Sequence, residues 1–145
     1  MHTVQEILRE KGDRVWTIGP QETVLEGLRA MAEHSVGALV VTERKEVVGI
    51  LSERDYARKI ILLGRTSAGT TVGEIMSSPV ISAAPDWDVE DCMRVMTENR
   101  IRHLPVLERG ELRGIVSIGD VVKTIITHQH FVIEQLSRYM QVGIE

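Results

Sequence analysis

Apolar residues alternate along the chain between short continuous runs and a helical spacing. Residues 15–18 (VWTI) form an extended run that ends at a Gly-Pro pair, which interrupts strands. Apolar side chains in 24–32 then recur at helical spacing, behind Thr23, which is placed to cap a helix together with Glu26. The pattern predicts a short strand followed by an amphipathic helix.

Two further apolar runs follow this helix, GALVV at 37–41 and VVGIL at 47–51, with the polar turn ERKE between them. Apolar runs of strand length that are joined by a short polar turn predict a β-hairpin. A second helix is expected to begin at Ser52. The unit is therefore β-α-β-β-α, and because its strands are apolar throughout, we expect helices to cover the sheet.

The same pattern occurs twice, 65 residues apart. Residues 15–58 align with 80–123 without a gap, and identical residues recur along the whole alignment. Just before each copy, VQEIL at 4–8 and VGEIM at 72–76 repeat at a slightly different spacing, which predicts a short lead-in helix ahead of each unit. Two units are too few for an open solenoid. The sequence therefore predicts an α/β fold in which two β-α-β-β-α units, related by a pseudo-two-fold axis, pack on each other through their sheets.

The repeat divides the chain into two units. The first covers 1–65 with its lead-in helix, and the second covers 66–145 with a linker and a C-terminal helix. The glycine- and threonine-rich stretch 63–71 connects them. The last segment, 128–145, predicts a terminal helix whose apolar face is available to a partner chain. The apolar residues of this face are Phe131, Ile133, Leu136 and Met140.

Composition and charge exclude several classes of function. A formal net charge of -4 at pH 7 provides no basic field for a nucleic-acid backbone or an anionic membrane, and an aromatic content of 3% provides few stacking surfaces for bases. The single cysteine, Cys92, excludes a disulfide framework and a cysteine-cluster zinc site, and it is expected to be a small core residue. No run of about 20 apolar residues is present, and the N-terminus lacks the apolar stretch of a signal peptide. We therefore expect a cytoplasmic protein with no membrane span and no nucleic-acid partner.

One phrase closes each predicted hairpin, GILSERD at 49–55 and GIVSIGD at 114–120. In the pattern S-x-x-D after a strand, the serine and the aspartate are placed as a capping box, which satisfies free backbone amides at the start of a helix. The same geometry suits a ligand, because free amides attract an anion and a carboxylate accepts the two hydrogens of a ribose diol. The two interpretations are compatible.

With SVGALVV and IRHLPVL before these phrases and VGEIMSSPVIS at the start of the second copy, the chain resembles the cystathionine-beta-synthase (CBS) domain family. The resemblance covers nearly all of the chain and implies a stand-alone tandem pair, called a Bateman module. It further implies that adenosine-containing ligands bind in a cleft between the units, and that the module dimerises and acts as a metabolite sensor. Among such ligands we expect AMP first, with ATP, ADP, NAD(H) or S-adenosylmethionine as alternatives.

The resemblance assigns roles to individual positions. Asp55 and Asp120 match the ribose-binding aspartate of the family, so two sites are open to a ligand. Arg54 is replaced by Gly119 in the second copy and is placed to contact a phosphate, which predicts unequal sites. The expected nucleotide-binding positions are Thr17, Val36, Gly37, Ala38, Ser52, Arg54, Asp55, Ser82, Ile101, Arg102, His103, Leu104, Pro105, Ser117 and Asp120.

Other classes of function remain as alternatives. An enzyme would need a base, a nucleophile or a metal set in one cleft, and Ser52 has no evident histidine to activate it, so we expect no catalysis. His128 and His130 lie on different faces of a helix without a third ligand, so no metal is expected. If the two aspartates only cap helices, a dimerisation scaffold becomes the better interpretation, with a nucleic-acid-binding protein behind it. In the sensor interpretation the chain forms a homodimer and signals to an effector protein that the sequence does not identify.

Overall fold

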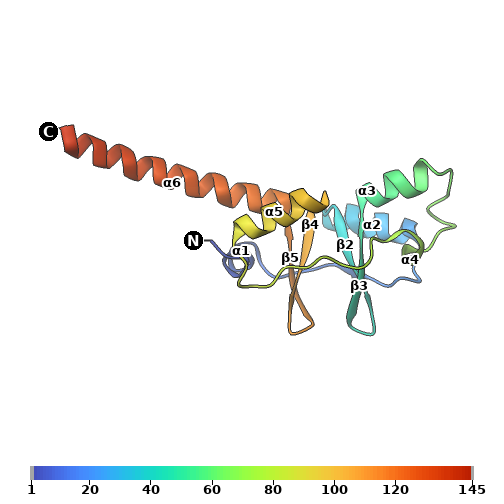
Figure 1. Ribbon diagram of the computed structural model, residues 1–145. Coiled ribbons are helices and arrows are strands. Elements are labelled where there is room, and N and C mark those ends of the chain that lie inside the picture. Colours follow the sequence, from blue (N-terminus) through green and yellow to red (C-terminus); the bar gives the residue numbers. More distant parts are fainter. Residues whose placement is uncertain (1, 145) are drawn as a thin grey trace.

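The computed structural model describes residues 2–144 and shows two similar units side by side (Figure 1). The first unit follows the predicted order of strand, helix, hairpin and helix. Its elements are β1 (Thr17–Ile18), α2 (Val24–His34), β2 (Ala38–Glu43), β3 (Glu46–Ser52), α3 (Glu53–Tyr56) and a π-helical segment (Ala57–Ile61).

The second unit repeats this order with one difference. The position equivalent to β1 is reduced to a single parallel bridge between Ala83 and Val106. The other elements of the unit are α5 (Val89–Asn99), β4 (His103–Glu108), β5 (Glu111–Ser117) and α6 (Ile118–Ile144). The predicted α/β fold of two repeated units is confirmed.

The two hairpins pair in the same register. Leu39 lies opposite Leu51 between β2 and β3, and Leu104 lies opposite Val116 between β4 and β5. Each hairpin carries one irregularity at the equivalent place, and β1 runs parallel to β2 at the edge of the first sheet. These four central side chains have no exposed surface, because helices cover the strands as predicted.

Two hydrophobic cores fill the molecule, and each includes a lead-in helix that precedes the other unit in chain order. Helix α1 (Val4–Lys11) buries its apolar face, including Leu8, in the second core. Helix α4 (Val72–Ile75) buries Ile75 in the first core. Chain order assigns α1 to residues 1–65, whereas its packing assigns it to the second unit.

Two glycines make room for these exchanged helices. A Cβ atom added to Gly114 would lie 2.7 Å from a methyl group of Leu8, and one added to Gly49 would lie 2.5 Å from the sulfur of Met76. Atoms of side chains do not approach so closely in a well-packed interior. The glycine that opens each repeated phrase is therefore a packing requirement of the lead-in helix above it.

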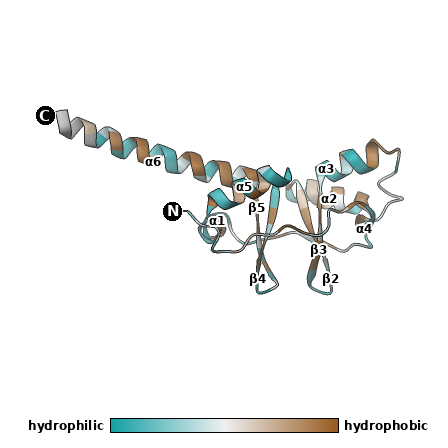
Figure 2. Cartoon of the chain, viewed as in Figure 1, coloured by the Kyte–Doolittle hydropathy of each residue, from teal (hydrophilic) through white to brown (hydrophobic). Residues whose placement is uncertain are grey.

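Helix α6 extends well past the second unit and projects from the body of the molecule (Figure 1). Apolar and polar segments alternate along this projecting part (Figure 2). Phe131, Ile133, Leu136 and Met140, which the sequence places on an apolar face, are each more than half exposed. None of the helices within residues 2–144 has both the length and the apolar character that crossing a bilayer requires.

Candidate functional site

A cleft of about 930 Å³ lies where the two units meet. One wall comes from the first unit, from the end of β3 through α3 to Lys59. The opposite wall comes from the second unit, from the segment 99–103 ahead of and at the start of β4. The extended segment 77–81 forms a third side, because Ser77 bridges to Ile50 of β3 through backbone hydrogen bonds.

Asp55 lies in the wall of this cleft at the start of α3, where it forms the predicted capping box with Ser52. Its Oδ2 accepts hydrogen bonds from the backbone nitrogen and the hydroxyl of Ser52, each at 3.0 Å. Its Oδ1 accepts a 3.0 Å hydrogen bond from the hydroxyl of Ser77 and lies 3.2 Å from Nζ of Lys59. The carboxylate is buried but fully partnered, and the lysine beside it supplies the counterion.

Positive charge exceeds negative charge around the cleft. Two acidic side chains line it, Glu53 and Asp55, against five basic ones. The basic residues are Arg54, Arg58, Lys59, Arg100 and Arg102. In a chain with a net charge of -4, this local excess makes the cleft a favourable place for an anion.

Arg54 reaches across the boundary between the units. Its guanidinium donates a hydrogen bond to the backbone carbonyl of Arg100 in the second unit. Its other N–H groups remain available as donors, because a guanidinium carries five of them. Arg54 therefore links the units directly and also lies where a bound anion would meet it.

Apolar side chains from both units and from the extended segment 77–81 also line the cleft. They are Ile50, Pro79, Val80, Ile81, Ile101 and Ile118. Ile81 is 38% exposed, which is unusual for a large aliphatic side chain in a recess. The cleft therefore offers apolar surface to a flat, weakly polar group as well as an excess of basic side chains.

His103 begins β4 on the cleft wall, close to Gly37 of the first unit. Burial lowers the pKa of His103 below its usual range, and the positive charge of Lys11 acts in the same direction, although Asp120 opposes both. The imidazole is therefore neutral at pH 7, and it can donate or accept a hydrogen bond without adding charge to the cleft.

The structure brings some of the positions predicted from sequence into this cleft and leaves others outside it. Those in the cleft are Gly37, Ser52, Arg54, Asp55, Ile101, Arg102 and His103. Those outside its lining are Thr17, Val36, Ala38, Ser82, Leu104, Pro105, Ser117 and Asp120. Of the latter group, Ala38, Leu104 and Pro105 are buried within the strands of the two hairpins.

Sequence reasoning missed several cleft residues that the fold supplies. Lys59 and Arg58 lie one turn beyond Asp55, and a lysine four residues after an aspartate is a recognisable helical pair. Ser77 and Arg100 carried no such signal. Their positions depend on the bridge to β3 and on the left-handed residue that ends α5, which is Arg100 itself.

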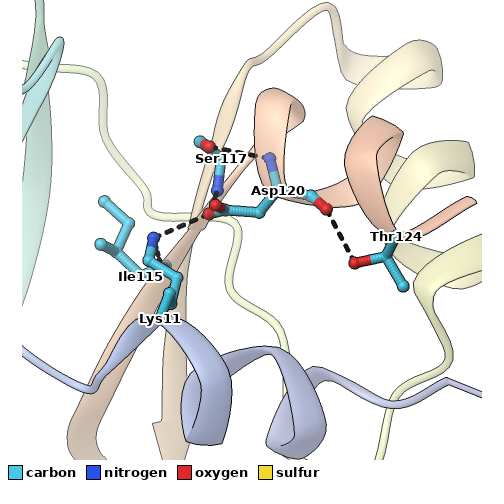
Figure 3. A network of polar contacts seen from close by, with 5 residues as sticks. All are labelled: Lys11, Ile115, Ser117, Asp120 and Thr124. Atoms are coloured by element: carbon cyan, nitrogen blue, oxygen red, sulfur yellow. Dashed lines mark hydrogen bonds and ion pairs between the residues drawn. The ribbon is translucent and has the colours of Figure 1, made fainter. Parts of the chain in front are cut away.

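The second repeated phrase has a different environment (Figure 3). Asp120 accepts a 2.9 Å hydrogen bond from the backbone nitrogen of Ser117, and its own backbone nitrogen donates to the Ser117 hydroxyl, so the cap is present here too. The carboxylate also receives a 2.7 Å hydrogen bond from Nζ of Lys11, which donates as well to the carbonyl of Ile115. Burial alone would raise the pKa of Asp120, but the hydrogen bonds from Lys11 and Ser117 outweigh it and hold the pKa below its usual range.

The remaining reactive side chains form no separate centre in the part of the chain that is described. Cys92 is buried in the second core, and burial raises the pKa of its thiol to about 11, so it is a core residue as the sequence suggests. His128 pairs with His2 rather than with His130. Within residues 2–144 no three His, Cys, Asp or Glu side chains are grouped to hold a metal ion.

Comparison with known proteins settles the family. Residues 4–62 and 72–127 each match the CBS domain. The chain belongs to the CBS domain family. The two matches follow the two repeats in chain order, and each includes the lead-in helix that precedes its repeat, although that helix packs in the core of the other unit.

The chain is similar to other proteins with CBS domains, some of which are stand-alone CBS pairs. The mitochondrial CBS domain-containing protein CBSX3 of Arabidopsis thaliana is 39% identical over 97% of this chain and 73% of its own length. A Burkholderia ambifaria protein with CBS domains, to which a role in signal transduction is attributed, is 43% identical with a TM-score of 0.84, over 88% of this chain and 96% of its own. A hexameric CBS-CP12 protein from bloom-forming cyanobacteria is 31% identical with a TM-score of 0.76, over 84% of this chain and 70% of its own.

Proposed function

We propose that this CBS pair is a regulatory module that binds an adenine nucleotide in the cleft between its units and signals the occupancy to a protein partner. The observation that carries the proposal is the cleft itself, which unites apolar surface, a carboxylate and an excess of basic side chains. Adenine, ribose and phosphate would each find a matching kind of group in this lining. Adenosine ligands are also common among CBS domains, which supports the assignment.

The geometry suggests which residue would meet each part of the nucleotide. The adenine ring would lie against Ile81 and Ile101, and the ribose diol would reach the carboxylate of Asp55. At Asp55 the diol would take the place of the Ser77 hydroxyl, an exchange of one neutral donor for another that leaves Lys59 beside the carboxylate. The phosphate would lie near Arg54, whose unused N–H groups make charge-assisted hydrogen bonds.

Signalling would follow from the position of the cleft. A ligand there touches both units, and it shifts their relative arrangement only as far as it binds one arrangement more tightly than another. Arg54 already ties the units together through the Arg100 carbonyl, and a phosphate would compete for its guanidinium. Binding would therefore act directly on a contact between the units.

Titration calorimetry with AMP, ATP, ADP, NAD, NADH and S-adenosylmethionine tests the proposal. We expect one of these to bind, and Asp55→Asn to weaken its binding by about tenfold to a hundredfold because a charge-assisted hydrogen bond is lost. Asp86→Asn, at an exposed loop position, is the matched control and should bind like the wild type. If all six ligands give no heat with a well-folded protein, the aspartate is only a helix cap and the scaffold interpretation gains.

Comparing the binding of AMP with that of adenosine tests whether Arg54 contacts the phosphate. Arg54→Ala should weaken binding of AMP and leave binding of adenosine unchanged, because only AMP carries the charge that Arg54 would meet. Equal loss for the two ligands would instead indicate that Arg54 acts through the contact with Arg100.

We further propose that the chain forms a homodimer through the projecting part of α6. Ile126, Ile133 and Met140 lie seven residues apart, and Leu136 falls between the last two at coiled-coil spacing. All four side chains are between 47% and 63% exposed. A second copy of the chain carries the same spacing and would cover this face, since two identical helices of this pattern are complementary to each other.

A further inference from the structure

The lead-in helices differ in length, and the difference falls beside the two aspartates. Leu8 of α1 lies over Gly114, and Met76, just past the end of α4, lies over Gly49, so the two side chains occupy equivalent places. After Met76 the chain becomes extended at once, whereas α1 continues for nearly a further turn to Lys11. This extra turn accounts for the different spacing at which the lead-in segments repeat.

Ser77 and Lys11 therefore follow equivalent anchors but bring different chemistry. Ser77 donates from its backbone nitrogen to the Ile50 carbonyl at 2.9 Å and from its hydroxyl to Asp55 at 3.0 Å. In the second unit the ammonium of Lys11 does both, at 3.0 Å to the Ile115 carbonyl and 2.7 Å to Asp120 (Figure 3). A charged group thus takes the two partners that a neutral residue takes in the first unit.

The source of the counterion differs as well. Lys59, in the π-helical segment that directly follows α3, neutralises the Asp55 carboxylate from four residues away. The equivalent position in the second unit is Thr124, whose hydroxyl donates to the backbone carbonyl of Asp120 at 2.9 Å and brings no charge. Asp120 is neutralised instead by Lys11, more than a hundred residues earlier in the chain, with side chains that are 33% and 22% exposed.

We propose that the ammonium of Lys11 is a built-in occupant of the second nucleoside position, so that this chain takes a nucleotide at the Asp55 cleft only. The inference rests on the proposed function, and it makes Lys11 the residue that sets the number and location of sites. A diol arriving at Asp120 must displace an ammonium group, which breaks a partly exposed ion pair and its charge-assisted hydrogen bond of 2.7 Å. A diol arriving at Asp55 displaces one hydroxyl and leaves the counterion in place.

Packing holds the backbone of α1, and with it the base of the Lys11 side chain, beside Asp120. Helix α1 is held on the second core by Val4, Ile7 and Leu8, all at most 6% exposed. Gly12 follows with a φ of 95°, a conformation that glycine adopts easily, and it turns the chain away directly after Lys11. The ammonium therefore cannot swing clear of Asp120 without a change in its rotamers or movement of α1.

Lys11→Met tests the inference, because methionine retains the apolar stem of lysine and removes its charge. With AMP as the probe, calorimetry should show one nucleotide per chain for the wild type and two for Lys11→Met. The second event should disappear in Lys11→Met/Asp120→Asn, whereas Asp120→Asn alone should bind AMP like the wild type. Lys59→Met is the matched control, since it removes the corresponding charge from the first unit and should add no second event.

The double variant Lys11→Met/Asp55→Asn separates this inference from the proposed function. It should bind one AMP per chain through Asp120, whereas Asp55→Asn alone should bind AMP about tenfold to a hundredfold more weakly than the wild type does. Binding by the double variant with none by the wild type would overturn the Asp55 site and retain the inference. If the wild-type chain binds two nucleotides and one of them depends on Asp120, the inference is wrong and the proposed function stands. If Lys11→Met gains no second binding event, the inference is wrong whatever the other variants show.

Discussion

His103 stands at the point where both units and the lead-in helix α1 come together. Its ring lies near Gly37 of the first unit, and the charges of Lys11, Asp120 and Arg102 act on it. Burial is the largest of these influences and lowers the pKa of the imidazole, with Lys11 and Arg102 adding to the effect and Asp120 opposing it. The native state therefore binds fewer protons at this position than the unfolded chain does in mildly acidic solution.

Acidification from about pH 7.5 to about pH 5 should destabilise the wild type more than His103→Asn. Because the folded pKa lies below the unfolded value of about 6.5, the stabilisation is fully present above that value and is lost as the pH falls toward and through the folded pKa. Urea unfolding at the two pH values measures the difference, and the contributions of all other titrating groups are shared by both proteins. An equal loss of unfolding free energy in the two proteins would contradict the assignment.

Gly27 is the buried counterpart of Cys92 in the middle of α2. A Cβ atom there would lie 2.6 Å from a methyl group of Leu51, whose side chain has no exposed surface and little space to move into. Gly27→Ala should therefore lower the free energy of unfolding by about 1 to 3 kcal/mol, although alanine is the better helix former. Gly119→Ala is the matched control, since its nearest neighbour is 3.6 Å away and it lies exposed in the first turn of α6.

Urea denaturation of both glycine variants gives the comparison. The Gly119 variant should be unchanged or more stable by up to about 1 kcal/mol, because only the helix propensity changes there. If Gly27→Ala were as stable as the wild type, the core around Leu51 would have room that the packing does not indicate.

Local residue patterns were sufficient to predict the caps but not the partners of the capping carboxylates. The S-x-x-D phrases indicate capping boxes at Ser52 and Ser117, and both are formed. The ammonium of Lys11 lies beside Asp120 only because α1 crosses to the second unit. A contact between residues so far apart in the chain leaves no periodic pattern in the sequence, so the sequence could not predict the pairing of Lys11 with Asp120.

At the scale of elements, the spacing of the apolar residues correctly predicted the type of most helices and strands and their order along the chain. The helices α2 and α5 and both hairpins follow the predicted pattern, since each has a strong period of its own and defined caps. The equivalent of β1 in the second unit is shorter than the repeat predicts, because this segment forms only the single bridge between Ala83 and Val106. The exchange of lead-in helices was not predictable, since either core could have accepted their apolar faces.

Two negative charges on the projecting part of α6 should abolish the proposed homodimer. Ile133→Glu/Leu136→Glu places carboxylates at the centre of the apolar face, where pairing would bury them without partners. Light scattering coupled to size-exclusion chromatography should report a dimer for the wild type and a monomer for the double variant. Gln135→Glu adds a charge at an exposed polar position of the same helix and should leave the dimer intact.

Two outcomes of this experiment would contradict the prediction. A double variant that keeps the wild-type mass would place the interface on another surface, and a wild type that is monomeric at every concentration would remove the homodimer from the proposal. Neither result would alter the nucleotide site, because none of the residues changed lines the cleft.

At the scale of the whole molecule, the two cores are interlocked rather than merely adjacent. Helix α1 lies in the second core while the chain that follows it enters the first sheet, and α4 lies in the first core while the chain that follows it enters the second unit. Backbone hydrogen bonds fasten both crossings, from Val4 to the Trp87 carbonyl and from Val72 to the Glu22 carbonyl. Neither unit can lose its core without releasing a helix that is covalently continuous with the other unit.

The two units should therefore unfold in one cooperative transition. The chain contains two tryptophans, of which Trp16 packs against the first core and Trp87 against the second. Trp16→Phe leaves a fluorescence probe in the second unit only, and Trp87→Phe leaves one in the first unit only. Urea curves for Leu8→Ala in each background should both shift to lower midpoints, with a loss of about 2 to 4 kcal/mol, because the cavity that opens in the second core removes a support shared by both units. If only the Trp87 signal shifted while the Trp16 signal kept its midpoint, the units would unfold independently and the exchanged helices would not couple them.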